Sequence, residues 1–141
     1  MKPTPELPES ESEPSYTGGC LCGAIRYVAR GVPVNVRICH CRICQRATGA
    51  PFFARALFPI DAVAVQGRTS AFASSPELRR RFCPSCGTSV FAQREEAYLA
   101  VTLASLDEPG QLPPTLHMWT SSKVPWVELN DGLPQFSEWP T

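Results

Sequence analysis

The hydrophobic positions after residue 15 fall in short runs of the kind that predicts β-strands. These runs are rich in Val, Ile, Phe and Tyr, and Gly or Pro lies at many of their boundaries. The expected strands cover residues 24–31, 33–39, 51–58, 62–67, 70–75, 79–83, 88–93 and 97–103. This pattern predicts an all-β (mainly β) domain.

Helices are expected to be short. Fifteen prolines are spread over the 141 residues, and a proline inside a helix removes a backbone donor and disrupts the helix. Helical turns are predicted only after Cys44, in residues 45–50, and around residues 105–108.

The first fifteen residues differ from the rest of the chain. They hold four prolines and one lysine against four glutamates, which is a composition with little apolar surface to bury. We therefore expect residues 1–15 to form a loose acidic tail and residues 16–141 to form one domain.

The charge and hydropathy of the chain indicate which partners and which compartment to expect. The chain has 13 basic and 13 acidic residues, and this balance does not predict a nucleic-acid or membrane surface. The start lacks the basic end and apolar run of a signal peptide, and no apolar run is long enough to span a bilayer. We expect a cytoplasmic protein, in which cysteines are metal ligands or catalytic groups more often than disulfides.

The seven cysteines form three groups: Cys20-Leu-Cys22, Cys39-His-Cys41-x-x-Cys44 and Cys83-Pro-Ser-Cys86-Gly. The last is the most specific, because proline and glycine in C-P-x-C-G let the backbone turn both sulfurs towards one metal ion. Such a knuckle needs two more sulfurs. Either the first group or two cysteines of the second group would complete the site, and spacing alone does not decide between them.

If the first and third groups combine, three cysteines remain. Three protein ligands with one open position are typical of a catalytic zinc site. The alternatives are a second structural site, with His40 or a distant residue as fourth ligand, and a disulfide framework.

Several polar residues lie near the second group. Arg37, Arg42 and Arg46 would offset the charge of three thiolates or bind a carboxylate, or they are surface residues. Gln45 and Thr48 are candidates for hydrogen bonds to a substrate, or they too lie on the surface.

Two histidines and an arginine run are interpreted as structural. His40 lies between two cysteines and is expected to point away from their metal, and His117 is expected to be a packed histidine. On a strand, Arg79 and Arg81 would share one face and Arg80 the other, and a solvated face is favoured over a nucleic-acid patch.

The C-terminal aromatic residues have two interpretations. They either close the core or cover a sheet edge, which we favour, or they line a ligand pocket or a subunit interface. The residues are Trp119, Trp126, Phe136 and Trp139.

Six stretches together resemble the glutathione-dependent formaldehyde-activating (Gfa-like) proteins, which also include the centromere protein V group. They are GGCLCGAIRY (18–27), CHCRICQRATGAPF (39–52), FCPSCGTSVF (82–91), LASLDEP (103–109) and HMWTSSKVPW (117–126) with DGLPQF (131–136). The resemblance implies an Mss4-like fold of small curled antiparallel sheets. It also implies two zinc ions per chain: a structural zinc on Cys20, Cys22, Cys83 and Cys86, and an active-site zinc on Cys39, Cys41 and Cys44.

The resemblance further implies a carbon–sulfur lyase that adds the thiol of glutathione, or a similar small thiol, to formaldehyde or another aldehyde. The fourth ligand of the inner zinc would then be water or the sulfur of the substrate, with possible support from Arg42, Gln45 and Arg46. Two other functions stay open: a non-catalytic zinc module for protein partners, and a metal- or redox-sensing site. The sequence does not indicate the oligomeric state.

Overall fold

The computed structural model describes residues 13–141, so most of the expected tail lies outside the described residues. Strand β1 (Ser15–Gly19) begins at the last residue assigned to that tail. Among the described residues, no helix is both long and apolar enough to cross a membrane.

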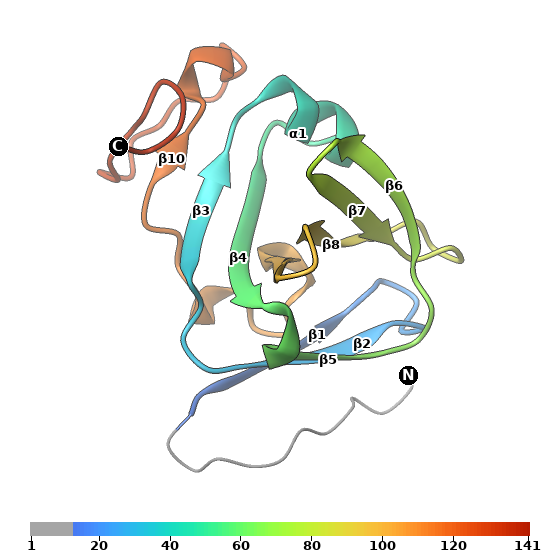
Figure 1. Cartoon of the computed structure of the whole chain (residues 1–141). Coiled ribbons are helices and arrows are strands. Elements are labelled where there is room, and N and C mark those ends of the chain that lie inside the picture. The colour runs from blue at the N-terminus through green and yellow to red at the C-terminus, as the bar shows by residue number, and fades with distance from the viewer. Residues whose placement is uncertain (1–12) are drawn as a thin grey trace.

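The strands form two sheets (Figure 1). The smaller sheet is antiparallel, in the order β1-β2-β5, with β2 at Arg26–Arg30 and β5 at Val63–Gln66. The larger sheet has the order β10-β3-β4-β9-β8-β7-β6, and only the β10–β3 pair is parallel. Its strands are β3 (Asn35–Cys39), β4 (Phe53–Pro59), β6 (Ser70–Ser75), β7 (Leu78–Phe82), β8 (Ser89–Arg94), β9 (Tyr98–Thr102) and β10 (His117–Met118).

These sheets confirm the mainly-β prediction, and a strand lies in each of the eight expected segments. Strands β1 and β10 were not expected. The first has the sequence SYTGG and the second is only two residues long, so neither has a hydrophobic period, and both depend on the strand that they pair with.

The one α-helix within residues 13–141, α1 (Arg42–Thr48), begins earlier than predicted. The Cys41 sulfur accepts a hydrogen bond from the Cys44 backbone N–H at 3.3 Å and thereby caps the helix. Gly49 ends it in the left-handed conformation, at φ 69°. Short 3₁₀ turns occur at Ile60–Ala62, Leu103–Ser105, Pro109–Gln111 and Thr120–Ser122, so the turn expected around residues 105–108 is replaced by two that flank it.

The larger sheet separates two hydrophobic clusters. One face packs towards the smaller sheet, and its cluster includes Tyr27, Phe58 and Phe91. The opposite face carries a smaller cluster that includes Cys39 and Cys44. Figure 1 shows how the sheet curls, so that β3 and β4 lie on one side, β6 and β7 on the other, and α1 near the top of both.

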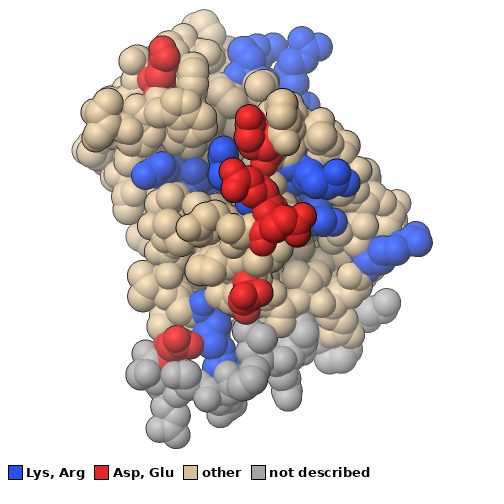
Figure 2. Space-filling view, viewed as in Figure 1, with Lys and Arg blue, Asp and Glu red and all other residues tan. Residues whose placement is uncertain are grey.

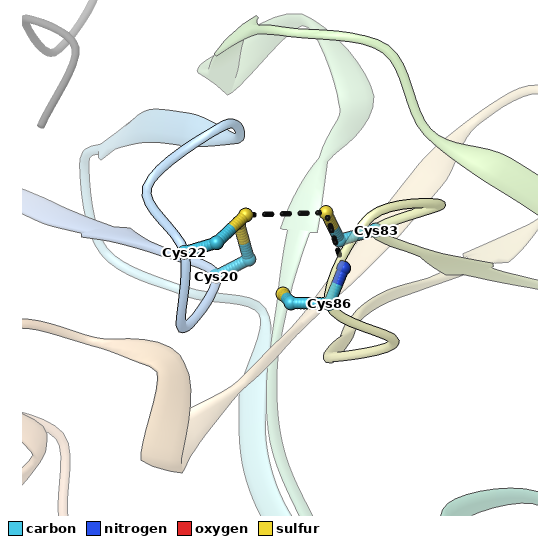
Figure 3. A group of neighbouring side chains, drawn as sticks. All are labelled: Cys20, Cys22, Cys83 and Cys86. Carbon is cyan, nitrogen blue, oxygen red and sulfur yellow. Dashed lines mark hydrogen bonds between the residues drawn. The ribbon is translucent and has the colours of Figure 1, made fainter.

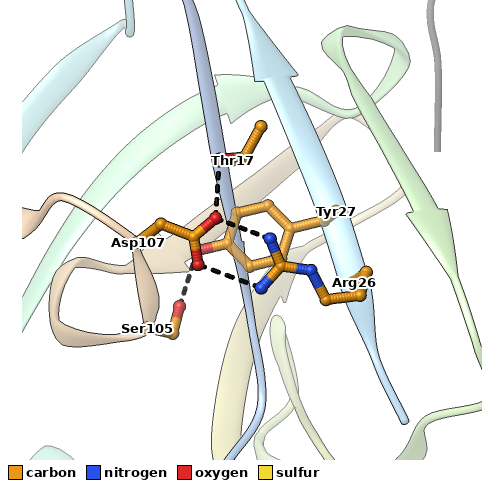
Figure 4. A network of polar contacts seen from close by, with 5 residues as sticks. All are labelled: Thr17, Arg26, Tyr27, Ser105 and Asp107. Carbon is orange, nitrogen blue, oxygen red and sulfur yellow. Dashed lines mark hydrogen bonds and ion pairs between the residues drawn. The ribbon is translucent and has the colours of Figure 1, made fainter. Parts of the chain in front are cut away.

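A polar network joins the smaller sheet to the chain that follows β9 (Figure 4). Arg26 donates two hydrogen bonds to the Asp107 carboxylate, at 2.9 and 2.5 Å, and the Thr17 hydroxyl donates a third at 2.7 Å. The Ser105 hydroxyl donates to a backbone carbonyl, so the Tyr27 hydroxyl, 2.6 Å away, is the donor to Ser105. The network holds the β1–β2 hairpin in place.

The Arg26 guanidinium holds the pKa of the Asp107 carboxyl below its usual value, and Thr17 lowers this pKa further. A carboxyl with a lowered pKa in the folded state stabilises the fold above its unfolded pKa of about 3.9. The stabilisation is lost as the pH falls through the lower folded value.

Replacing Asp107 by Asn is expected to lower the free energy of unfolding by about 1–2 kcal/mol at pH 7, because the nearly buried Arg26 loses its charged acceptor. Solvent screening limits the effect, since the Asp107 side chain is 42% exposed. The difference from wild type should shrink progressively below about pH 4. Urea unfolding at several pH values measures it.

The exposed neighbour Glu108 provides the control, and Glu108→Gln should change the free energy of unfolding by less than about 0.5 kcal/mol. In acid, the wild-type protein and the two variants lose any bound metal alike. Metal loss therefore does not affect the comparison of their free energies of unfolding. An Asp107→Asn effect of equal size at pH 7 and about pH 2.5 would contradict the assigned ion pair.

Candidate functional site

Two distant segments bring four cysteines together (Figure 3). Cys20 and Cys22 lie on the loop between β1 and β2, and Cys83 and Cys86 lie on the turn between β7 and β8. All four sulfur atoms lie within 4.8 Å of one another, and Cys22 is 3.6 Å from Cys20 and 3.7 Å from Cys83. This cluster could hold a metal ion, and it pairs the C-x-C and C-P-x-C groups that spacing alone could not pair.

Backbone N–H groups point at the sulfurs of this cluster. The N–H of Ile25 donates to Cys20 at 3.2 Å, and the N–H of Cys86 donates to Cys83 at 3.4 Å. Gly87 turns the chain in the left-handed region, at φ 80°, where a side chain would be strained. Hydrogen bonds from the Thr88 hydroxyl and backbone N–H lower the pKa of the Cys86 thiol to about 5, which favours the thiolate that binds metals.

The other three cysteines form a second cluster, which could also hold a metal ion. Cys39 ends β3, Cys41 caps α1, and Cys44 lies in the first turn of α1. Their sulfur atoms lie within 4.8 Å of one another. Hydrogen bonds with the thiols of Cys39 and Cys44 lower the pKa of Cys41, while hydrogen bonds with Cys41 and Cys44 raise that of Cys39. All seven cysteines are free, so no disulfide framework is present.

Arg80 lies on strand β7, three strands from β4 in the larger sheet, and its side chain contacts the second cluster. Its Nη2 donates to the Cys44 sulfur at 3.3 Å, its Nε donates to the Ser74 hydroxyl at 3.0 Å, and its guanidinium lies 5.1 Å from the centre of the Phe53 ring. Arg80 is only 2% exposed. The expectation that the arginine run forms a solvated face is therefore wrong for this residue.

The strand alternation explains the burial of Arg80. Arg79 is exposed, and Arg80 points to the opposite, concave face of β7. Across that face, Arg80 is opposite Ala92 on β8, Ala92 is opposite Ala100 on β9, and Ala100 is opposite Leu57 on β4. The alternation of side chains along a strand was the only sequence signal that Arg80 differs from its neighbours. Three consecutive arginines are also typical of a solvent-exposed strand, so the burial of Arg80 was not predicted.

The concave face encloses a cavity of about 420 Å³. Ala92 and Ala100 lie side by side in the middle of the sheet, and their small side chains leave the space open. All three cysteines of the second cluster line the cavity, and none of the four cysteines of the first cluster does. A ligand in the cavity would therefore lie beside the three sulfurs.

Two tryptophans from the C-terminal part complete the wall of the cavity. Trp119 and Trp139 line it, with ring centres 5.8 Å apart in an edge-to-face arrangement. Trp119 has a φ of 58°, which is an uncommon conformation for a bulky side chain. For these two residues, the pocket interpretation of the C-terminal aromatics is correct, whereas Trp126 is 73% exposed and does not line the cavity.

Both histidines belong to a buried hydrogen-bonded chain. His40 Nε2 lies 2.8 Å from His117 Nδ1, and His117 Nε2 lies 2.7 Å from the Asp131 carboxylate. Burial and, to a smaller extent, the nearby His117 lower the pKa of His40 to about 4, so His40 is neutral at pH 7. His40 is not part of the three-cysteine cluster and does not line the cavity, and its ring packs against Phe52 and His117. The link to Asp131 was missed, because nothing in the local sequence pairs it with His117.

The other predicted site residues lie in different surroundings. Arg42 lines the cavity, whereas Arg46 is exposed and does not. Gln45 is buried, and its amide is occupied: it donates to the carbonyls of His40 and Ser122, at 2.6 and 2.9 Å, and accepts from Arg42. Gln45 thus anchors α1.

Two comparisons with known proteins bear on this site. A Schizosaccharomyces pombe protein named as an uncharacterized lyase is 33% identical over 78 residues, which cover 55% of this chain and 57% of that protein. The matched part is thus little more than half of that relative. The family model described as glutathione-dependent formaldehyde-activating enzyme matches residues 15–122, which include both cysteine clusters. Because this match covers most of the chain, the protein belongs to the glutathione-dependent formaldehyde-activating enzyme family.

Proposed function

We propose that this protein is a zinc-dependent carbon–sulfur lyase that adds a small thiol, such as glutathione, to formaldehyde or another aldehyde. The observation that carries the proposal is the position of three convergent cysteine sulfurs on the wall of a cavity of about 420 Å³. Family membership and the lyase name of the fission-yeast relative support it.

The donor atoms of both clusters suit zinc. Four thiolates form a closed tetrahedral site of the structural kind, so we assign Cys20, Cys22, Cys83 and Cys86 to a structural zinc. Three thiolates leave one position for an exchangeable ligand, so we assign Cys39, Cys41 and Cys44 to an active-site zinc. The chain would thus hold two zinc ions.

Zinc at the three-cysteine site would supply one chemical effect, namely the lowering of the pKa of a thiol that binds there. In the addition, the thiol sulfur bonds to the carbonyl carbon, the carbon–oxygen π bond breaks, and the proton of the thiol ends on the oxygen. The reverse reaction breaks the carbon–sulfur bond and returns the thiol and the aldehyde.

The residues of the chain have defined parts in this proposal. Arg80 donates to Cys44 and offsets the negative charge of the three thiolates. Trp119 and Trp139 provide an apolar wall of the cavity against which a bound ligand would pack. Arg42 lies at the cavity and is a candidate for substrate binding, whereas Arg46 does not line the cavity and the amide of Gln45 is already bonded within the fold.

The proposed partners are small molecules. On the face that Figure 2 shows, acidic side chains gather in the middle with basic ones around them, an arrangement that does not favour a nucleic-acid surface. Free thiols in both clusters suit a reducing compartment, and we propose the cytoplasm.

Two-dimensional exchange NMR tests the reaction directly. It measures the interconversion of glutathione and its formaldehyde adduct, with zinc-loaded protein and with an equal zinc concentration in buffer alone. We expect the protein to accelerate the exchange at least about tenfold, which corresponds to a barrier about 1.4 kcal/mol lower. Cys41→Ser should abolish the acceleration, because it removes one of the three sulfurs at the cavity wall.

Circular dichroism provides the control that Cys41→Ser keeps the native fold. An acceleration that persists in the folded variant would contradict the role of the three-cysteine cluster. No acceleration by the wild-type protein, with glutathione or with other thiols and aldehydes, would favour a non-catalytic module or a sensor instead.

A further inference from the structure

We propose that Arg55, Arg80 and Arg94 form an anion-binding subsite in the cavity, which holds a carboxylate of the thiol whose sulfur binds at the three cysteines. This inference deepens the proposed function and rests on it for the position of the sulfur. It names three specificity-determining residues, none of which was among the sequence-predicted site residues.

The first argument is the charge of the cavity lining. Among the described residues, four arginines line the cavity, namely Arg42, Arg55, Arg80 and Arg94, against the single acidic residue Glu77. Within residues 13–141, the ion pairs found are Arg26 with Asp107 and His117 with Asp131. The described part of the chain therefore supplies no carboxylate partner to the four arginines of the cavity.

The second argument is the surroundings of Arg55. It lies directly opposite Arg37 on the neighbouring strand, an arrangement that is unfavourable for two like charges. Its Nη1 donates to the side-chain carbonyl of Asn35, which is a neutral acceptor. Burial and the charge of Arg37 lower the pKa of Arg55 to about 10. An anion beside Arg55 would relieve the repulsion and replace some of the lost hydration.

The third argument is an unused donor on Arg80. Two of its guanidinium nitrogens donate to Cys44 and Ser74, but the buried Nη1 has no partner. A buried N–H group without an acceptor is unfavourable, because it has lost its hydrogen bonds to water. Because Arg80 lines the cavity, a small shift of its guanidinium would bring this buried donor to a ligand there.

Arg94 is placed to share such a ligand. It is opposite Leu78 on β7, and Arg80 is opposite Ala92 on β8, so Arg80 and Arg94 are diagonal neighbours on one face of the sheet. Diagonal neighbours are on the order of 7 Å apart, which two arginine side chains can bridge to one carboxylate. Arg94 also packs 5.9 Å from the centre of the Trp139 ring, at the cavity wall.

A matched pair of probes tests the subsite by binding alone. 3-Mercaptopropionate carries a carboxylate, and 3-mercaptopropionamide has nearly the same shape without the charge. Calorimetric titration of the zinc-loaded full chain should show that the acid binds at least about tenfold more tightly than the amide, because a carboxylate accepts charge-assisted hydrogen bonds from arginine.

Arginine variants show which side chains cause the preference for the acid over the amide. Arg94→Gln and Arg55→Gln should each reduce it to less than about threefold, because each removes one of the cations. Arg79→Gln removes the same charge from the exposed face of β7 and should leave the preference unchanged. If Arg55→Gln does not fold, the half-buried Arg94 and the charge-conserving Arg55→Lys variant still test the proposal.

The outcomes separate this inference from the proposed function. Equal affinity for acid and amide in wild type, or a preference that survives both Arg→Gln variants, overturns the subsite and leaves thiol binding intact. If neither thiol binds, the proposed function fails, and the subsite is then tested with succinate, which has no sulfur. Shifts of the arginine Nε–H NMR signals that disappear in Arg94→Gln support the subsite, and no succinate binding overturns it.

Discussion

The hydrogen bond from Arg80 to Cys44 joins strand β7 of the larger sheet to the helix α1, across 36 residues of sequence. Cys44 lies on α1, which follows β3, whereas Arg80 lies on β7, three strands beyond β4 in the sheet order. The contact requires the sheet to curl, and the curl encloses the cavity. A buried guanidinium beside three sulfurs also fits a cluster of thiolates better than neutral thiols, because the positive charge needs a negative neighbour.

The two cysteine clusters lie in different surroundings. The four-cysteine cluster joins the β1–β2 loop to the β7–β8 turn, so a metal ion there would tie the smaller sheet to the larger one. The Arg26–Asp107 pair also holds this hairpin, by joining it to the chain that follows β9. The three-cysteine cluster comes from a single stretch of chain and faces the cavity, so it suits the exchange of a ligand better than the joining of segments.

The sequence predicted eight of the ten described strands and the three groups of cysteines because both have local signals, whereas the pairing of the first and third cysteine groups was implied only by the family resemblance. Short β-branched runs with Gly and Pro boundaries predict strands, and C-P-x-C-G predicts a turn that presents two sulfurs. The start of α1 was predicted too late, because a cysteine is not a usual helix cap, and here Cys41 has that part. The carboxylate of Asp131, which binds His117 from 14 residues away, has no local signal. The burial of Arg80 depends on the curl of the sheet, which no short stretch of sequence specifies.

The central claim is that one chain holds a closed four-sulfur site and an open three-sulfur site, and native mass spectrometry of the full chain purified without chelator tests it most directly. The account predicts two zinc ions per wild-type chain and one in a folded Cys41→Ser variant, with the mass of a fully reduced protein. A single zinc ion per wild-type chain, or a mass deficit that corresponds to disulfides, would contradict it.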